Sequence, residues 1–494
     1  MSEQEKVKIA KLATGVRGLD EILGGGLPEY SFNIIAGAPG SGKTTLAHQL
    51  MFAIATPERP ALFFTVLGEP PFKMLRYQQQ FDFFDLTKVS TSVRFLNLSN
   101  LMLEDNLDGV LEEIVRGVEA VNPSIVVIDS FRTVLKTVDG KGSERKLQKF
   151  VQRLAIHLTS WQATTFFIGE YAEQEIRDNP VFTVADGLFW LSQQIEHNSI
   201  VRKLQVMKLR GQDSVPGLHT FRITTAGLQA FPRTFGLHED TSIDISDRRL
   251  STSIDELDAM MGGGIPEGDS LLVAGPSGSG KSVLGSQFIA NGLRQGEPGI
   301  VAVFEERPGA YIRRATKLGM DFQKFIDQGT LRLLYLRPLD LSVDETVHEI
   351  VSAVREIGAK RLVIDSLAGL EMALAPSFRS DFRESLYRMI AALTRLGVTI
   401  VSTVEVQEKF TGFDLSTYAI SFLADDIIRF RYVSINGELR KVLVVIKMRG
   451  GDHCSEIREY TINSKGIEVG RCITGYSGLI SGIPETDNIL DRLS

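Results

Sequence analysis

Two short glycine-rich segments contain the residue types that bind phosphate. Both match G-x-x-x-x-G-K-[S/T] and lie between a strand-like apolar run and a helical pattern, the context that this motif requires. The glycines let backbone N–H groups face a phosphate, the lysine neutralises its charge, and the hydroxyl binds Mg²⁺. The expected nucleotide-binding residues are Gly37, Gly40, Ser41, Gly42, Lys43, Thr44 and Thr45, and in the second segment Gly275, Gly278, Ser279, Gly280, Lys281, Ser282 and Val283.

Two aspartates complete the expected metal sites. Asp129 and Asp365 each end an apolar run that is typical of a buried central strand, and each follows its phosphate loop at a similar distance. A carboxylate in this place organises the shell of a Mg²⁺ ion. We therefore expect Thr44 with Asp129, and Ser282 with Asp365, to hold the metal.

The candidate catalytic carboxylates differ between the two segments. After the run GIVAVF stands the pair Glu305-Glu306, placed to orient a water or hydroxyl for in-line attack on a γ-phosphate. The first segment has Leu67-Gly68 at the equivalent place, followed one position later by Glu69. Either Glu69 takes over the role through a local shift, or the first site binds nucleotide and turns it over poorly.

These motifs belong to an internal duplication. The run TGVRGLDEILGGGLP reappears as TSIDELDAMMGGGIP, and the phosphate loops, the Asp-ending runs and the K-[LM]-R-G motifs repeat in the same order at offsets of 236 to 239 residues. The repeat unit is therefore a whole domain. We expect a first domain over 1–235, a linker over 236–250 that includes a short lead-in strand, and a second domain over 251–494.

Within each copy, short β-branched runs alternate with longer helical patterns. Near-continuous apolar runs such as FNIIAG and SLLVAG are expected to be strands buried on both faces, and 107–120 and 343–356 are expected to be helices. This alternation predicts an α/β fold, in which each copy is a mostly parallel twisted sheet flanked by helices.

The ordered, doubled set of motifs resembles the KaiC family of circadian clock proteins and their relatives, within the RecA-like ATPases. The GGG-P entry motifs, both phosphate loops, the Glu-Glu pair, the Asp-ending strands, KMRG and IREY carry the resemblance, which covers nearly the whole chain. It implies two tandem RecA-like P-loop NTPase domains, ATP and Mg²⁺ as cofactors, and a homohexamer of two rings with ATP between neighbouring subunits. In the family the first ring hydrolyses ATP and the second phosphorylates its own residues.

The resemblance also gives a role to the K-[LM]-R-G motifs. It implies that Lys208, Leu209 and Arg210, and Lys447, Met448 and Arg449, reach the γ-phosphate of the neighbouring subunit's ATP. This is an arginine-finger arrangement, in which the cation arrives only when the ring is assembled. The alternative is a positively charged surface hairpin.

Two departures from the family pattern concern phosphorylation and partners. The family has adjacent Ser-Thr acceptors, whereas this chain aligns Ser421 with the serine and Phe422 with the threonine, so we expect a single acceptor at Ser421, with Ser416 and Thr417 as weaker candidates. After Ile480–Pro484 only ten residues follow, so we expect no capture by a KaiA-like activator. A KaiB-like partner on the first ring stays open.

Composition restricts the function classes. The chain has 54 Lys+Arg against 61 Asp+Glu, a net charge of −7, only two cysteines and no apolar run long enough for a membrane helix. We expect a cytoplasmic protein that contacts no membrane and does not bind nucleic acid by charge. Two alternatives stay open beside the ATPase and serine autokinase: a RecA/DnaB-like ATPase that depends on single-stranded DNA, and a signalling scaffold whose first ring merely holds ATP.

Overall fold

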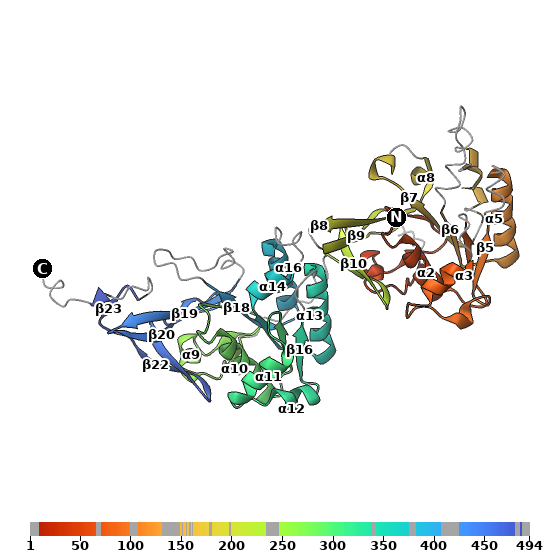
Figure 1. Ribbon diagram of the computed structural model, residues 1–494. Coiled ribbons are helices and arrows are strands. Elements are labelled where there is room, and N and C mark those ends of the chain that lie inside the picture. The colour runs from red at the N-terminus through yellow and green to blue at the C-terminus, as the bar shows by residue number, and fades with distance from the viewer. Residues whose placement is uncertain are drawn as a thin grey trace, which may run out of the picture. The chain divides into compact units, whose positions relative to one another are not determined.

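The computed structural model divides the chain into two compact units, residues 1–233 and 234–494 (Figure 1). Of the predicted linker 236–250, it describes the part from residue 247 onward, which includes the short strand β12 (Arg249–Leu250). The predicted domain boundaries stay predictions. The structure describes residues 9–65, 71–98, 107–130, 149–150, 152–154, 156–157, 160, 162–176, 180–196, 199–233, 247–336, 342–374, 382–406, 424–479 and 485–486.

The first unit is built on a nine-stranded sheet in the order β11-β10-β9-β8-β3-β7-β6-β4-β5. The six strands from β8 to β5 pair in parallel, and β9, β10 and β11 continue the sheet as antiparallel neighbours. The strands are β3 (Phe32–Gly37), β4 (Ala61–Thr65), β5 (Val93–Asn97), β6 (Ile125–Asp129), β7 (Thr164–Glu170), β8 (Gly187–Glu196), β9 (Ser199–Leu209), β10 (His219–Thr224) and β11 (Gly227–Phe231).

Helices cover both faces of this sheet because successive residues of its parallel strands point into two different cores. Ile35 packs with residues of α2, whereas Ile34 packs with residues of α5. Among the described residues, the α-helices of the first unit are α1 (Leu19–Ile22), α2 (Lys43–Ile54), α3 (Pro71–Gln78), α5 (Leu107–Val121) and α8 (Pro180–Val184), and a two-stranded ribbon pairs β1 (Lys11–Leu12) with β2 (Leu27–Pro28).

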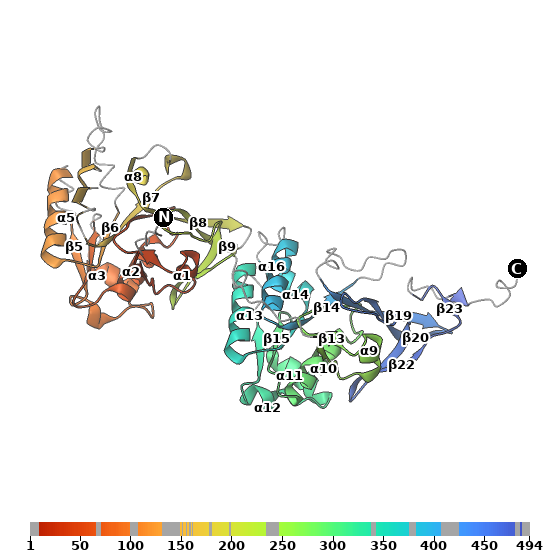
Figure 2. The same cartoon turned by 180° about the vertical axis from the view of Figure 1, so that it is seen from behind.

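The second unit repeats this architecture (Figure 2). Its nine strands follow the order β16-β15-β17-β18-β14-β19-β20-β21-β22, parallel from β16 to β19 and antiparallel from β19 to β22. They are β14 (Ser270–Gly275), β15 (Gly299–Val303), β16 (Leu331–Tyr335), β17 (Arg361–Asp365), β18 (Thr399–Glu405), β19 (Asp426–Ile435), β20 (Glu438–Lys447), β21 (Arg458–Asn463) and β22 (Gly466–Cys472).

Two helical layers again enclose the sheet. Leu271 and Val273 belong to the same core as residues of α9, α10, α11 and α12, and Leu272 and Ala274 belong to the core that includes residues of α13, α14 and α16. The short pairs β12 with β13 (Ile265–Pro266) and β23 (Tyr476–Ser477) with β24 (Glu485–Thr486) complete the strands. The helices that the structure describes in this unit are α9 (Asp255–Met260), α10 (Lys281–Arg294), α11 (Pro308–Lys317), α12 (Phe322–Asp327), α13 (Val343–Ile357), α14 (Leu367–Ala373) and α16 (Phe382–Arg395).

The predicted fold class is confirmed: each unit is a mostly parallel α/β sheet covered by helices. The two helices predicted from apolar periodicity, 107–120 and 343–356, are α5 and α13, each one residue longer than expected. The run SLLVAG is the fully buried strand β14. Within the described residues no helix is long and apolar enough to cross a membrane.

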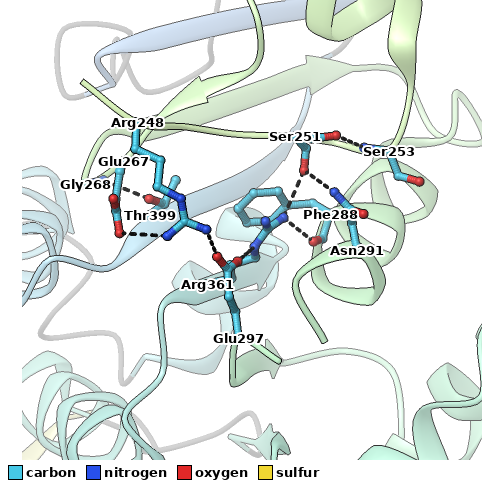
Figure 3. Close-up of polar contacts among 10 residues, drawn as sticks. All are labelled: Arg248, Ser251, Ser253, Glu267, Gly268, Phe288, Asn291, Glu297, Arg361 and Thr399. Atoms are coloured by element: carbon cyan, nitrogen blue, oxygen red, sulfur yellow. Dashed lines mark hydrogen bonds and ion pairs between the residues drawn. The ribbon is translucent and has the colours of Figure 1, made fainter. Parts of the chain in front are cut away.

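A buried ion pair ties the start of the second unit to its core (Figure 3). The Arg361 side chain, only 1% exposed, donates through Nε to Glu297 Oε2 at 2.8 Å and through Nη1 to the carbonyls of Ser251 and Phe288. Its guanidinium carbon lies 4.6 Å from the centre of the Phe288 ring, and Arg248 pairs with the same glutamate. The guanidinium therefore joins the lead-in segment, α10 and β17.

We expect Glu297→Gln to destabilise the second unit by about 3 kcal/mol, because a guanidinium left buried without its counter-charge is costly. The double variant Glu297→Gln/Arg361→Met should lose less than the sum of the single variants, because both charges are then absent. Urea unfolding measures the three free energies.

Glu356→Gln is the matched control for this cycle. Glu356 pairs with Arg332 on the surface, with a side chain that is 58% exposed, so its neutralisation should change the free energy of unfolding by no more than about 0.5 kcal/mol. Equal losses of unfolding free energy in Glu297→Gln and Glu356→Gln would show that the buried ion pair stabilises the protein no more than the surface pair does.

Candidate nucleotide sites

The phosphate loops follow the first parallel strand of each unit and lead directly into a helix. Gly42 and Gly280 are the residues before α2 and α10, with φ of 97° and 98°. A Cβ at either position would lie 2.6 Å from the Cδ1 atom of Ile223 or Ile462, respectively. Both the left-handed backbone and the close packing therefore require glycine, and the helix N-terminus faces the loop.

The loop lysines lie on the carbonyl oxygens at the start of their own loops. Lys43 Nζ donates to the carbonyls of Gly37 and Ala38 at 3.0 and 2.7 Å, and Lys281 Nζ donates to those of Gly275 and Pro276 at 2.9 and 2.8 Å. Burial lowers the pKa of both lysines, and neighbouring carboxylates oppose this effect. Each ammonium is thus held inside the loop, where it can meet a phosphate.

Carboxylates surround both lysines because the neighbouring parallel strands end at the same edge of the sheet. Gly37 pairs in register with Glu170 at the end of β7, and Gly275 pairs with Glu405 at the end of β18. The charge of Glu170 acts on Lys43 together with that of Asp129. Glu405 has the same effect on Lys281. These two glutamates are site residues that the motifs do not include.

The predicted metal ligands of the first unit are close together. Thr44 Oγ1 donates to Asp129 Oδ2 at 2.7 Å, so a hydroxyl and a carboxylate oxygen stand side by side at the loop. Oxygen donors of this kind suit Mg²⁺, which is usually held by one or two carboxylates together with phosphate and water. The described part of the chain has no group of three or more His, Cys, Asp or Glu arranged to hold a metal by itself.

The second unit arranges its carboxylates differently. Asp365 Oδ1 accepts a hydrogen bond from Thr403 Oγ1 at 2.6 Å. Glu305 Oε1 accepts one from Ser366 Oγ at 3.1 Å, and Glu306 Oε2 lies 2.7 Å from Arg314 Nη1. The structure thus brings Glu305, Glu306 and Asp365 to the same edge of the sheet as Lys281.

The two predicted cationic motifs are held in the same way in both units. Arg210 Nη1 lies 3.2 Å from Asp186 Oδ1, and Arg449 Nη1 lies 3.0 Å from Asp425 Oδ1. Lys208 Nζ donates to the carbonyl of Thr183 at 3.0 Å, and Lys447 Nζ donates to that of Ala424 at 2.7 Å. Both motifs stand at the amino ends of the parallel strands, on the edge opposite the phosphate loop.

The position of the cationic motifs at this edge follows from the register of the strands. Leu209 pairs with Gly187, which pairs with Asn33 near the start of β3, four residues before the loop begins at Gly37. Four residues of strand span about 13 Å. The motif of each unit is therefore remote from the phosphate loop of the same unit.

The fold and site define a class of protein: tandem P-loop nucleoside triphosphatases, with a Mg²⁺-type hydroxyl–carboxylate pair beside the first phosphate loop and a carboxylate cluster beside the second. A family model described as "ATPase: KaiC" matches residues 12–234 and 250–472. The chain belongs to this KaiC ATPase family, which confirms the resemblance inferred from its motifs.

Similar proteins include cyanobacterial KaiC sequences. The circadian clock oscillator protein KaiC of Picosynechococcus is 29% identical over 486 residues, covering 96% of this chain and 92% of the relative. KaiC 1 of Synechocystis is 29% identical, with the same coverage. KaiC of Prochlorococcus marinus is 28% identical and covers 97% and 96% of the two chains. This chain is a divergent member.

Several predicted residues lie outside the described part of the chain, and several site residues escaped prediction. Glu69 and the acceptor Ser421, with Ser416, Thr417 and Phe422, belong to the first group. Glu170, Glu405, Thr403 and Arg314 belong to the second. The end of a strand next to the phosphate-loop strand is the only signal that could have indicated Glu170 and Glu405.

A cluster of three aspartates supports the cationic motif of the second unit. Asp425 Oδ2 accepts hydrogen bonds from the N–H and hydroxyl of Ser270, and Asp426, which is fully buried, accepts one through Oδ1 from the backbone N–H of Arg449. Burial and the charge of Asp269 raise the pKa of Asp426 to about 7. Burial and Asp425 raise that of Asp269 to about 6, while Arg249 and Arg449 partly oppose both effects.

These raised pKa values predict that stability falls as the pH rises. Asp426 keeps its proton in the folded state up to about pH 7, whereas the unfolded chain loses it near pH 4, so the folded state binds more protons between these values. We expect Asp426→Asn, which keeps the acceptor for Arg449, to stabilise the protein at pH 8 by on the order of 2 kcal/mol. The gain should be roughly half as large at pH 5.5, where the unfolded chain has already lost this proton, and should nearly disappear below about pH 4.

Thermal unfolding at the two pH values measures this difference, with the exposed Asp452→Asn as the control. A gain of the same size at pH 5.5 and pH 8 would contradict a proton-linked origin.

Proposed function

We propose that this protein is a homohexameric, Mg²⁺-dependent ATPase whose second nucleotide site also phosphorylates a serine of the same chain, so that bound nucleotide switches the state of the ring. The observation that carries this proposal is the position of the two K-[LM]-R-G motifs. Each is held by a matching lysine–carbonyl and arginine–aspartate contact, and each lies at the sheet edge opposite its own phosphate loop.

This position favours action on a neighbouring subunit. A cation that is separated by the length of a strand from its own phosphate loop cannot stabilise charge there, yet it is preorganised to meet an anion presented from outside. In a cyclic ring the same two surfaces meet at every interface, so each phosphate loop would receive the motif of the next subunit. Turnover would then require assembly.

The three carboxylates of the second site would have different roles. Glu305 influences the charge of Lys281 and accepts a hydrogen bond from Ser366, so it stands on the phosphate side and would orient the attacking water or serine hydroxyl. Glu306 is paired with Arg314, so it would help to position the neighbouring groups and would not act as the base. Asp365 and Ser282 would hold Mg²⁺, which when bound neutralises charge on the β- and γ-phosphates.

In the first site, Glu69 would take the place of Glu306. From the end of β4 at Thr65 to the start of α3 at Pro71 the chain has one residue more than from Val303 to Pro308 in the second unit. Counted back from the helix, Glu69 and Glu306 both stand two residues before the first helical proline, which leaves Gly68 at the position of Glu305. A first site that lacks the counterpart of Glu305 would bind ATP and hydrolyse it slowly.

A complementation experiment tests the action between subunits. Lys281→Ala and Arg449→Ala should each abolish hydrolysis at the second site. Rings containing both variants in equal amounts, purified through two different tags, should regain activity at about one quarter of their second sites, since those sites combine an intact loop with an intact neighbour.

The double variant Lys281→Ala/Arg449→Ala in one chain reports the background from the first sites. Arg440→Ala on strand β20, which ends two residues before Arg449, is the control for removing a surface charge. Mixed rings that stay at background would contradict action between subunits. Hydrolysis that is stimulated by single-stranded DNA and falls steeply with salt would favour the DNA-dependent ATPase instead.

Phosphorylation is tested separately by mass spectrometry of purified protein incubated with Mg·ATP. We expect one phosphate at Ser421, absent in Ser421→Ala and in Lys281→Ala and kept in Ser416→Ala and Thr417→Ala, because transfer needs the second phosphate loop. Failure to find phosphate under any condition would remove the autokinase activity and leave the ATPase.

A further inference from the structure

One cationic side chain that no motif includes lies among the carboxylates of the second site. Arg314 extends from α11, with Nη1 2.7 Å from Glu306 Oε2 and Nη2 3.9 Å from Asp365 Oδ2. Nη2 is buried and makes no hydrogen bond to the residues that the structure describes. A single guanidinium is thus shared between a candidate catalytic carboxylate and the candidate metal ligand.

A buried tyrosine fixes this guanidinium in place. The Arg314 guanidinium carbon lies 4.9 Å from the centre of the Tyr311 ring, and Tyr311 is fully buried. The Tyr311 hydroxyl lies 2.9 Å from Ser286 Oγ, which donates to the carbonyl of Ser282 at 2.8 Å. Arg314 is therefore connected, through one ring and two hydroxyls, to the helical turn that begins at the phosphate loop.

Within the described residues of the first unit, this arrangement has no counterpart. His48 occupies the position of Ser286, five residues after the loop lysine, and its ring stacks on Phe63 at 4.7 Å. Counted from the first proline of α3, Met74 and Tyr77 stand where α11 has Tyr311 and Arg314. The two sites therefore differ in charge as well as in their carboxylates.

We propose that Arg314 is a built-in counter-cation of the second site, which neutralises Glu306 and Asp365 together and competes with a divalent cation for Asp365. The inference rests on the proposed function, because it takes Asp365 as a ligand of the metal that accompanies the nucleotide. Arg314 Nη2 lies 3.9 Å from Asp365 Oδ2, so its charge would repel a dication held by the same carboxylate, and movement of Nη2 away from Asp365 would favour metal binding. Nη1 can keep its contact with Glu306 meanwhile.

This role makes a prediction that a merely structural role does not. Removing a structural contact near a metal site weakens metal binding, whereas removing a competing cation strengthens it. Arg314→Met keeps an unbranched side chain that can pack on the Tyr311 ring but removes the charge, and Arg314→Lys keeps the charge. Arg313, an exposed neighbour on the same helix, supplies the matched control Arg313→Met.

The test is a Mn²⁺ titration of the full-length protein saturated with ADP, followed by electron paramagnetic resonance. Arg314→Met should tighten one class of Mn²⁺ sites on the order of tenfold, the size expected when a unit charge is removed a few ångströms away under partial screening. The Mn²⁺ affinities of Arg314→Lys and Arg313→Met should both stay within about twofold of that of the unmodified protein. Unchanged or weaker Mn²⁺ binding in Arg314→Met would overturn the proposal.

Asp365→Asn separates this outcome from failure of the proposed function. It should remove the class of Mn²⁺ sites that Arg314→Met tightens. If it leaves all Mn²⁺ binding unchanged, Asp365 is not a metal ligand, and the metal-site assignment and the counter-cation role both fall. Circular dichroism checks the fold of each variant, and Arg314→Gln replaces Arg314→Met if the latter does not fold.

Discussion

The parallel pairing of the strand before each phosphate loop with its two neighbours is the interaction on which the rest of each site depends. Because β14 pairs in register with β18, Gly275 and Glu405 stand level, and β17 brings Asp365 to the same edge. Strands have a side-chain period of two, so a shift of one residue would turn the inward side chains to the opposite face. Burial on both faces of the sheet opposes any such shift, since Leu271 and Leu272 belong to different cores.

The same scaffold carries two chemically different sites. In the first, Thr44 donates directly to Asp129. In the second, Asp365 is approached by Thr403, which stands two residues before the strand end, where the first unit has Ile168. A hydroxyl on a neighbouring strand and an arginine on a helix thus give the candidate metal ligand of the second unit different hydrogen-bond and charge partners, while the phosphate-loop pattern stays the same. Divergence of duplicated domains can therefore begin beside the loop rather than in it.

Much of the fold could be predicted because it is encoded locally. The apolar runs that became β14 and β17 are buried on both faces, and the periodicity of α13 is that of a helix packed on one side. The sites could be predicted only as far as their residues are close in sequence to a motif. Glu405 and Arg314 were not predicted as site residues, because each lies in a segment without a distinctive pattern. Each becomes part of the site only when strands and helices pack together.

The sequence by itself determined which groups this protein can use: two glycine-rich loops with their lysines, two strand-ending aspartates, one pair of glutamates and two cationic motifs. It also determined the family, since the order and doubling of these motifs are properties of the chain. The tertiary structure alone decided where the groups face. Strand direction places the cationic motifs at the edge opposite the loops, and strand register places Glu170 and Glu405 beside the lysines. The physical reason is that charge acts through space, and the distances between charges are set by packing among segments far apart in the chain.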